Sequence, residues 1–180
     1  MKKSLLALLT LGILSVSLLR PSTANAQFTN NAFYIGPELA LAGIGSSGVA
    51  FGAFGEVPIT HPGSVGSGRL AIALRLDFWT FNDVYYNYTF IPVGVYLDYH
   101  FALDDRKFDP FIGLGLGYLI LNESYTGPSD GKFSVGYNSG IYVTGQVGAR
   151  YWFSPNVAGR AELGFGHSFI GAGVDFKLGG

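Results

Sequence analysis

The sequence predicts an all-β protein, and more narrowly an eight-stranded antiparallel up-and-down transmembrane β-barrel. Hydrophobic residues make up 48% of the 180 residues and charged residues only 13%, about half the usual charged share of a soluble domain. The 27 glycines, 15 phenylalanines and 11 tyrosines favour strands and tight turns over helices. Apolar and polar residues alternate along most of the chain, with the period of two that is typical of strands.

Composition also excludes several classes of function. The chain has no cysteine, so a disulfide framework, a thiolate zinc site and a cysteine nucleophile are excluded. Its net charge of −1 provides no basic surface that could bind nucleic acid through phosphates. No motif for a cofactor is present, because the Gly113-x-Gly115-x-Gly117 spacing of two is that of a strand face and no helix is predicted after it.

Residues 1–26 have the pattern of a cleavable secretory signal peptide. Lys2 and Lys3 precede an apolar run, and Ala24-Asn25-Ala26 follows it. The run has about 15 residues, against the roughly 20 that a spanning helix needs. We expect cleavage after Ala26, which leaves residues 27–180 as one outer-membrane barrel domain. No later stretch contains 18 consecutive apolar residues, so a membrane-embedded chain would have to cross the bilayer as a barrel.

Alternation recurs in eight segments, each about as long as a tilted membrane strand. They are Phe33–Ala42, Val49–Val57, Arg69–Phe81, Thr89–Phe101, Phe111–Leu121, Ile141–Phe153, Val157–Gly166 and Phe169–Leu178. Turn-forming residues fill the stretches between them. Pro58–Gly68 is long for a periplasmic turn, and Asn122–Gly140 is the longest expected external loop.

The phase of the alternation separates the charges from the large apolar side chains. One face of each segment, with residues such as Ile72, Leu74 and Leu76, carries no charge, and eleven charged residues lie on the opposite face. The predicted polar network of the lumen is Glu38, Glu56, Arg69, Arg75, Asp77, Asp98, His100, Gln146, Arg150, Arg160, Glu162, Asp175 and Lys177. Neighbours two apart, such as Arg160 and Glu162, are expected to pair, as are Arg75 with Asp77 and Asp98 with His100, and cross-strand partners are expected to complete these pairs.

Volume indicates which face points inward. The interior of an eight-stranded barrel is only just wide enough for side chains to fill it. The apolar face is crowded with Leu, Ile, Phe and Tyr, whereas the charged face is rich in glycine and alanine, such as Gly36, Ala73 and Gly113. We therefore expect the charges inside and the large apolar groups against lipid.

Outward aromatic residues fall near the ends of the segments, as in the two aromatic girdles of membrane barrels. The predicted girdle residues are Phe33, Tyr99, Phe101, Tyr151, Phe153 and Phe176 at the periplasmic boundary, and Phe78, Tyr118 and Phe165 at the external boundary.

Catalytic and metal sites are not expected. His167-Ser168 falls in the last external connection, where a serine beside a histidine would suit a lipid hydrolase, but a solvated turn is the expectation. His61 and His100 are too scattered for a metal cluster. The external stretches Asn82–Tyr88 and Asn122–Gly140 carry tyrosines that could bind a surface ligand.

The residues Ala149–Gly166 and Gly171–Leu178 resemble the closing strands of the small outer-membrane β-barrel domain family, the OmpA/OmpX-like eight-stranded proteins. Asp109–Tyr118 is similar to the fifth strand of that family. The resemblance implies insertion by the barrel-assembly machinery, which reads a last strand of alternating apolar residues that ends in an aromatic. Here Gly179-Gly180 follow the alternation instead.

These observations predict a monomeric, non-enzymatic protein of a Gram-negative outer membrane, with a charge-paired, plugged lumen and a structural or surface-interactive role. Its expected partners are outer-membrane lipid and, during insertion, the assembly machinery. No cofactor and no nucleic acid are expected. Three alternatives stay open: a small pore, a lipid hydrolase, and an adhesin that acts through the external loops.

Overall fold

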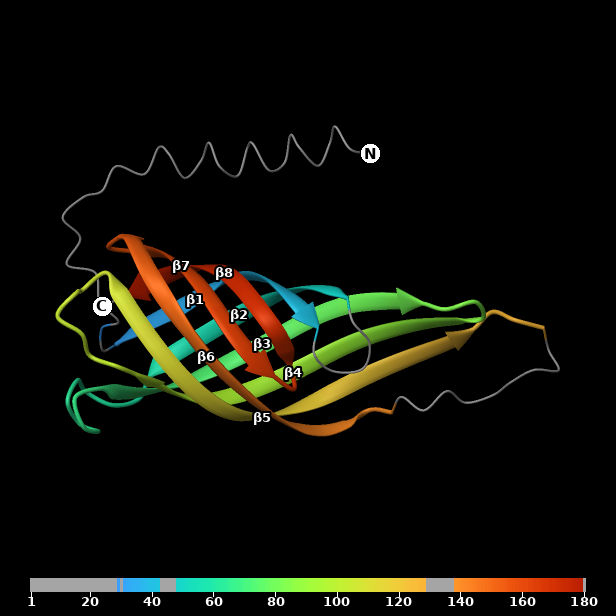
Figure 1. The fold of residues 1–180 in the computed structure, drawn as a ribbon, viewed down its shortest axis with the longest axis horizontal. Helices are drawn as coiled ribbons and strands as arrows, with labels where there is room; N and C mark the ends of the chain where they lie inside the picture. The colour runs from blue at the N-terminus through green and yellow to red at the C-terminus, as the bar shows by residue number, and fades with distance from the viewer. Residues whose placement is uncertain (1–28, 30, 43–47, 129–137, 180) are drawn as a thin grey trace, which may run out of the picture.

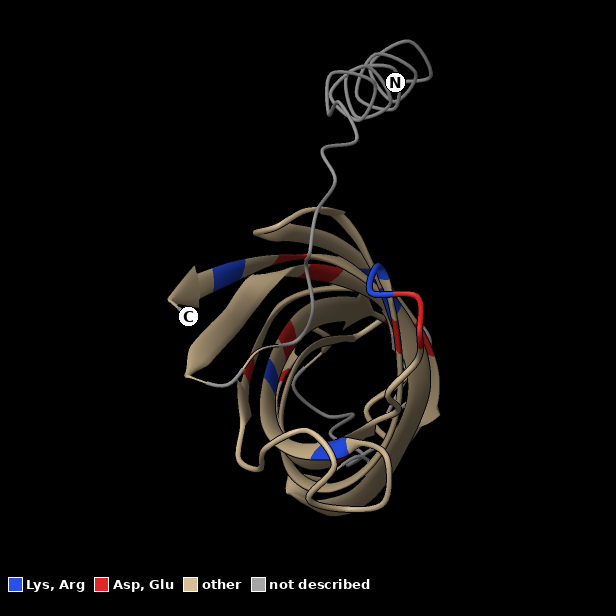
Figure 2. Cartoon of the chain, turned by 90° about the vertical axis from the view of Figure 1, so that its left-hand side faces the viewer, with Lys and Arg blue, Asp and Glu red and all other residues tan. Residues whose placement is uncertain are grey.

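The computed structural model describes residues 29, 31–42, 48–128 and 138–179. Its strands are β1 (Ala32–Ala42), β2 (Val49–Pro58), β3 (Arg69–Asn82), β4 (Tyr86–His100), β5 (Phe108–Tyr125), β6 (Gly140–Ser154), β7 (Val157–Phe165) and β8 (Ser168–Gly179). They form a closed barrel in chain order, and β1 pairs antiparallel with β8 (Figures 1 and 2). The predicted fold class is confirmed. The expected signal peptide lies outside the described residues.

The barrel has two different ends. At the lower end lie the start of β1, the end of β8 and the connection between β2 and β3, at the left of Figure 1. At the upper end, β3, β4 and β5 extend past the other strands (Figure 1). These three strands have 14, 15 and 18 residues, whereas β7 has 9. The upper rim is therefore raised on one side.

Two expected external loops are partly strand. Tyr86 pairs with Tyr125 and Tyr88 with Glu123, so β4 begins earlier and β5 ends later than the sequence predicted. Of the tyrosines in Asn82–Tyr88 that could bind a surface ligand, Tyr85 is exposed, whereas Tyr86 and Tyr88 are buried on the inner face. Alternating aromatic residues continue the ladder here, because they pack well on a pleated surface. Phe133 and Tyr137 of the second expected loop lie outside the described residues.

The outer face is apolar, as the alternation predicted. In β3, Ile72, Leu74 and Leu76 are each about half exposed, while Ala71 and Ala73 between them are fully buried. All nine predicted girdle residues are exposed or half-buried. Tyr99 also accepts a hydrogen bond from the Gly68 amide at 3.1 Å, which fastens the connection between β2 and β3. Such an exterior is suited to lipid and not to water. No helix in the described part of the chain is long and apolar enough to cross a membrane.

The inner face differs from the prediction in one respect. Beside the expected small residues it holds large aromatic side chains, which are fully buried: Tyr34, Phe54, Trp79, Tyr88, Phe90, Tyr96, Phe111 and Trp152. Glycines make the room for them and for the charges. A Cβ atom at Gly113 would lie 1.7 Å from Oδ1 of Asp98, and one at Gly115 would lie 3.0 Å from the Tyr96 ring. The lumen is therefore filled by large and small residues together.

Candidate functional site in the barrel lumen

The residues predicted for the lumen network are brought together inside the barrel. Twelve of the thirteen are buried, namely Glu38, Glu56, Arg69, Arg75, Asp77, Asp98, His100, Gln146, Arg150, Arg160, Glu162 and Asp175. Lys177, near the lower end of β8, is half-buried. Period-2 alternation places these side chains inside because each lies on the strand face opposite the large apolar residues.

The middle of the lumen is a ring of two acids and two arginines from β1, β3 and β7. Nη2 of Arg75 lies 2.7 Å from Oε2 of Glu38, and its Nε donates to the second oxygen at 3.2 Å, so this pair is bidentate. Arg75 also pairs with Glu162. Arg160 contacts Glu38 at 2.8 Å and Glu162 at 2.6 Å. Each acid therefore joins both arginines, which satisfies charges that would be very costly alone in this setting.

An aromatic side chain supports the arginines. The guanidinium carbon of Arg160 lies 3.8 Å from the centre of the Phe54 ring, and those of Arg75 and Arg150 lie 5.8 Å from it. A cation over a ring face is attracted to it, most strongly where water is excluded. Phe54 thus takes part in the network, although the sequence analysis did not single it out.

A second group near the lower end, here called the lower cluster, consists of Glu56, His100, Asp109, Arg150 and Asp175. Arg150 contacts Glu56 at 2.6 Å, Asp109 at 3.2 Å and Asp175 at 2.7 Å. His100 lies between the first two acids, 2.7 Å from Glu56 through Nε2 and 2.9 Å from Asp109 through Nδ1. Both nitrogens of the imidazole and all three nitrogens of the guanidinium therefore have carboxylate partners.

Asp109 is a member that the sequence analysis missed. The alternating segment begins at Phe111 and leaves Asp109 before it, but β5 begins at Phe108 and pairs Asp109 with Arg150 on β6. The available signal was its phase, because Asp109 is two residues before Phe111 and four before Gly113, which both face inward.

The third group, here called the upper cluster, consists of Asp77, Tyr142 and His167. Nε2 of His167 lies 2.6 Å from Oδ2 of Asp77, and Nδ1 lies 2.6 Å from the Tyr142 hydroxyl. The expectation of a solvated turn at His167-Ser168 is wrong, because His167 has no exposed surface and Ser168 only 4%. Gly166 turns the chain with a φ of 79°, and the amide of His167 donates to Thr144 Oγ1 at 3.3 Å. The β7–β8 turn therefore aims the imidazole into the lumen.

This geometry does not form the serine and histidine pair of a hydrolase. Both nitrogens of His167 already contact Asp77 and Tyr142, and Ser168 Oγ contacts neither of them. Nucleophilic catalysis needs the base within hydrogen-bond reach of the hydroxyl.

The expected pairs between neighbours on one strand are only partly present. Arg160 pairs with Glu162, but Arg75 does not pair with Asp77, nor Asp98 with His100, within the described residues. Asp98 instead accepts hydrogen bonds from Gln146 Nε2, at 2.9 Å to each oxygen. Residues two apart on a strand are separated by about 6.6 Å, so cross-lumen partners are closer.

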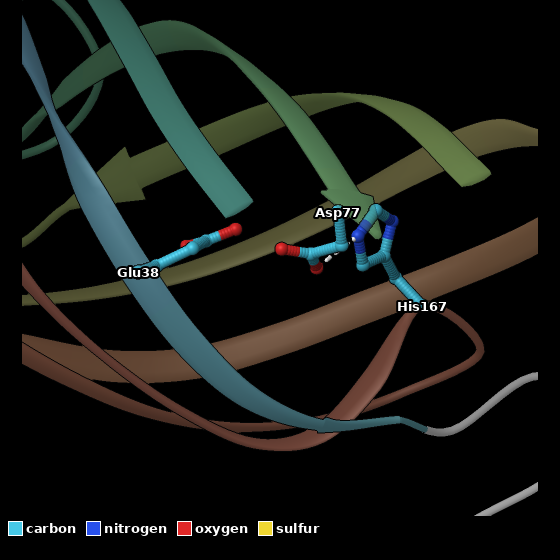
Figure 3. A group of neighbouring side chains, drawn as sticks. All are labelled: Glu38, Asp77 and His167. Carbon is cyan, nitrogen blue, oxygen red and sulfur yellow. Dashed lines mark hydrogen bonds and ion pairs between the residues drawn. The ribbon is translucent and has the colours of Figure 1, made fainter. Parts of the chain in front are cut away.

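Two groups in the described part of the chain bring potential metal ligands within 4.8 Å of one another. One is Glu38, Asp77 and His167 (Figure 3), and the other is Glu56, Asp98 and His100. Neither group could be predicted from the sequence, because their members come from strands far apart in the chain. His61, by contrast, is exposed in the lower connection.

No protein-family model and no curated protein sequence matches the chain. Two solved structures share its fold. One is Ail, the attachment invasion locus protein of Yersinia pestis, in complex with the heparin analogue sucrose octasulfate, with a TM-score of 0.55, 13% identity, and 82% of this chain and 97% of that chain covered. The other is the N-terminal β-barrel domain of Pseudomonas aeruginosa OprF, with a TM-score of 0.55, 19% identity, and 83% and 98% covered. The resemblance to the OmpA/OmpX-like proteins is confirmed in the fold, which is that of the small eight-stranded outer-membrane β-barrels.

Proposed function

We propose that this protein is a non-enzymatic, integral outer-membrane barrel whose lumen is closed by its own ion pairs. Its role is structural or depends on surface interactions of its upper rim. One observation carries the proposal: the ion pairs form a continuous chain across the lumen. It runs from Arg75 through Glu38, Arg160 and Asp175 to Arg150, and each step is a buried contact.

Such a chain opposes the passage of ions or solutes. A solute would have to separate buried pairs, and breaking one buried pair leaves an uncompensated charge at a cost of about 3–5 kcal/mol. The aromatic residues above and below the charged middle, such as Trp79 and Trp152, are also buried.

Conductance across a planar bilayer tests this proposal. We expect no steady current from the purified protein reconstituted in a bilayer. Two variants distinguish current through the lumen from leakage around the barrel. Arg75→Gln changes the lumen, and Arg106→Gln changes an exposed turn. A steady current whose ion selectivity responds to Arg75→Gln but not to Arg106→Gln would establish the pore and refute the proposal.

The raised side of the upper rim favours surface interaction as a second candidate. The connection between β3 and β4 exposes Val84 by 77% and Tyr85 by 50%. The described residues of this end include Asp83 and Glu123 but no lysine or arginine. This composition differs from what a sulfated ligand, such as the one bound to Ail, would need.

Adhesion of bacteria that display the protein to cultured epithelial cells tests this second candidate. Val84→Ser with Tyr85→Ser should reduce adhesion several-fold, because exposed aromatics act as anchors. Ile141→Ser, equally exposed on β6, serves as the matched control. Equal adhesion by both variants and the unmodified protein would exclude the raised side of the upper rim as an adhesion surface.

A further inference from the structure

The lumen holds more negative than positive formal charge. Among the described residues it buries seven carboxylates and four arginines. The carboxylates are Glu38, Glu56, Asp77, Asp98, Asp109, Glu162 and Asp175, and the arginines are Arg69, Arg75, Arg150 and Arg160. Because an uncompensated buried charge is very costly, the lumen needs either further positive charge or protonated carboxyl groups. A protonated His100, which lies between Glu56 and Asp109, would supply part of it.

The shortage of positive charge is clearest at Asp77. Its Oδ2 contacts His167, but its Oδ1 has no hydrogen-bond partner although the residue is only 1% exposed. In Figure 3, one Asp77 oxygen points toward the Glu38 carboxylate and the other is joined to the imidazole. Within the described residues, Asp77 pairs with no arginine. Two carboxylates that face each other in a buried site cannot both stay ionised unless a cation or a shared proton lies between them.

The three side chains are arranged as ligands of one ion. Each offers an oxygen or nitrogen atom within 4.8 Å of the other two, and all three residues are buried. Glycines line the site where a side chain would fill it. A Cβ at Gly52 would lie 1.7 Å from Oδ1 of Asp77, and one at Gly94 would lie 3.1 Å from Nδ1 of His167.

Surrounding residues hold these ligands in place. The Tyr142 hydroxyl contacts Nδ1 of His167 and so leaves Nε2 facing Asp77. Arg75 and Arg160 fix the Glu38 carboxylate, whose Oε1 accepts only one hydrogen bond, at 3.2 Å. Such contacts orient metal ligands and set the tautomer of a metal-binding histidine.

We propose that Glu38, Asp77 and His167 form a binding site for one divalent transition-metal ion, here probed with Zn²⁺. Zn²⁺ accepts a mixture of carboxylate oxygen and imidazole nitrogen, and a fourth position can be taken by water. A hard cation such as Mg²⁺ prefers oxygen ligands only, so the imidazole favours Zn²⁺ over Mg²⁺. The ion would neutralise the excess negative charge at the upper cluster.

The other group of potential ligands provides an internal control. Glu56, Asp98 and His100 are as close together, but every carboxylate oxygen of this group has a hydrogen-bond partner, whereas Oδ1 of Asp77 has none. Both nitrogens of His100 contact carboxylates, and both oxygens of Asp98 contact Gln146. This group should bind no ion.

The test is zinc binding by the protein purified from outer-membrane fractions in detergent, with heat-modifiable gel migration confirming that each variant is folded. Because the site is buried, Zn²⁺ is offered both to the folded barrel and during refolding. After gel filtration, elemental analysis should give one zinc per chain, with Mg²⁺ failing to compete. Asp77→Asn should weaken binding by at least about 100-fold, whereas Asp98→Asn should leave it unchanged.

Three outcomes would overturn the proposal. The first is a folded, unmodified protein that retains no zinc by either route. The second is equal zinc binding by the Asp77→Asn and Asp98→Asn variants, which would place the metal elsewhere. The third is a protonated-carboxyl infrared band that is present with Zn²⁺ supplied and disappears in Asp77→Asn, which would show that a proton supplies the missing charge.

Discussion

The lower and upper clusters use the same residue types with different results. Each places a buried histidine beside a carboxylate, but His100 has two carboxylate partners, which Arg150 also binds. His167 has one carboxylate and one tyrosine hydroxyl, and no arginine pairs with Asp77 among the described residues. Complete pairing suits a structural role, whereas an unsatisfied carboxylate oxygen suits the binding of a cation. The position of the arginines decides between the two.

The largest effect is expected from Arg150→Ala in the lower cluster. Its loss leaves Glu56, Asp109 and Asp175 without their shared cation, so the free energy of unfolding should fall by about 3–5 kcal/mol. Urea unfolding in phospholipid vesicles, followed by tryptophan fluorescence, measures the change. The control Arg106→Ala, in an exposed turn, should stay within about 0.5 kcal/mol. A cost below about 1 kcal/mol for Arg150→Ala would contradict the network.

A smaller effect is expected from His167→Ala in the upper cluster. This change removes the one ion-pair partner that Asp77 has among the described residues, and a buried group left without its partner costs about 1–3 kcal/mol. The same unfolding measurement applies. His61→Ala, at an exposed histidine, is the control and should be nearly neutral. If both variants are equally stable, the imidazole does not contribute to the lumen as described.

The smallest effect is expected from Tyr142→Phe, which deletes the hydroxyl that lies 2.6 Å from Nδ1 of His167 and donates to the Val93 carbonyl at 3.4 Å. The loss should be about 0.5–1.5 kcal/mol, the usual net contribution of one hydrogen bond. Tyr118→Phe on the outer face removes the same atom from an exposed side chain. Its unfolding curve should match that of the unmodified protein, and a larger loss at Tyr118 than at Tyr142 would reverse the assignment.

Alternation predicted the barrel wall well and its ends less well. The half-exposed Ile72 and Leu74 and the buried Arg75 and Asp77 follow from the phase of the alternation together with side-chain volume. The sequence did not place Tyr86 and Tyr88 in a strand, because Tyr85, just before β4, is also a tyrosine and no change in residue type marks where the strand begins. His167 was misjudged for a different reason: it directly follows Gly166, whose positive φ changes the direction of the chain, so phase cannot be extended through it.

The sequence by itself determined that large apolar side chains and charges lie on opposite faces, because the period of two is a local property of each strand. Side-chain volume then determined that the charges face inward. It could not determine which charges meet. Arg160 contacts Glu38 across 122 positions and Arg150 contacts Glu56 across 94. Those contacts depend on strand register and on closure of β8 against β1. Only the tertiary structure decided them, because in a narrow lumen an inward side chain can contact inward side chains from any other strand.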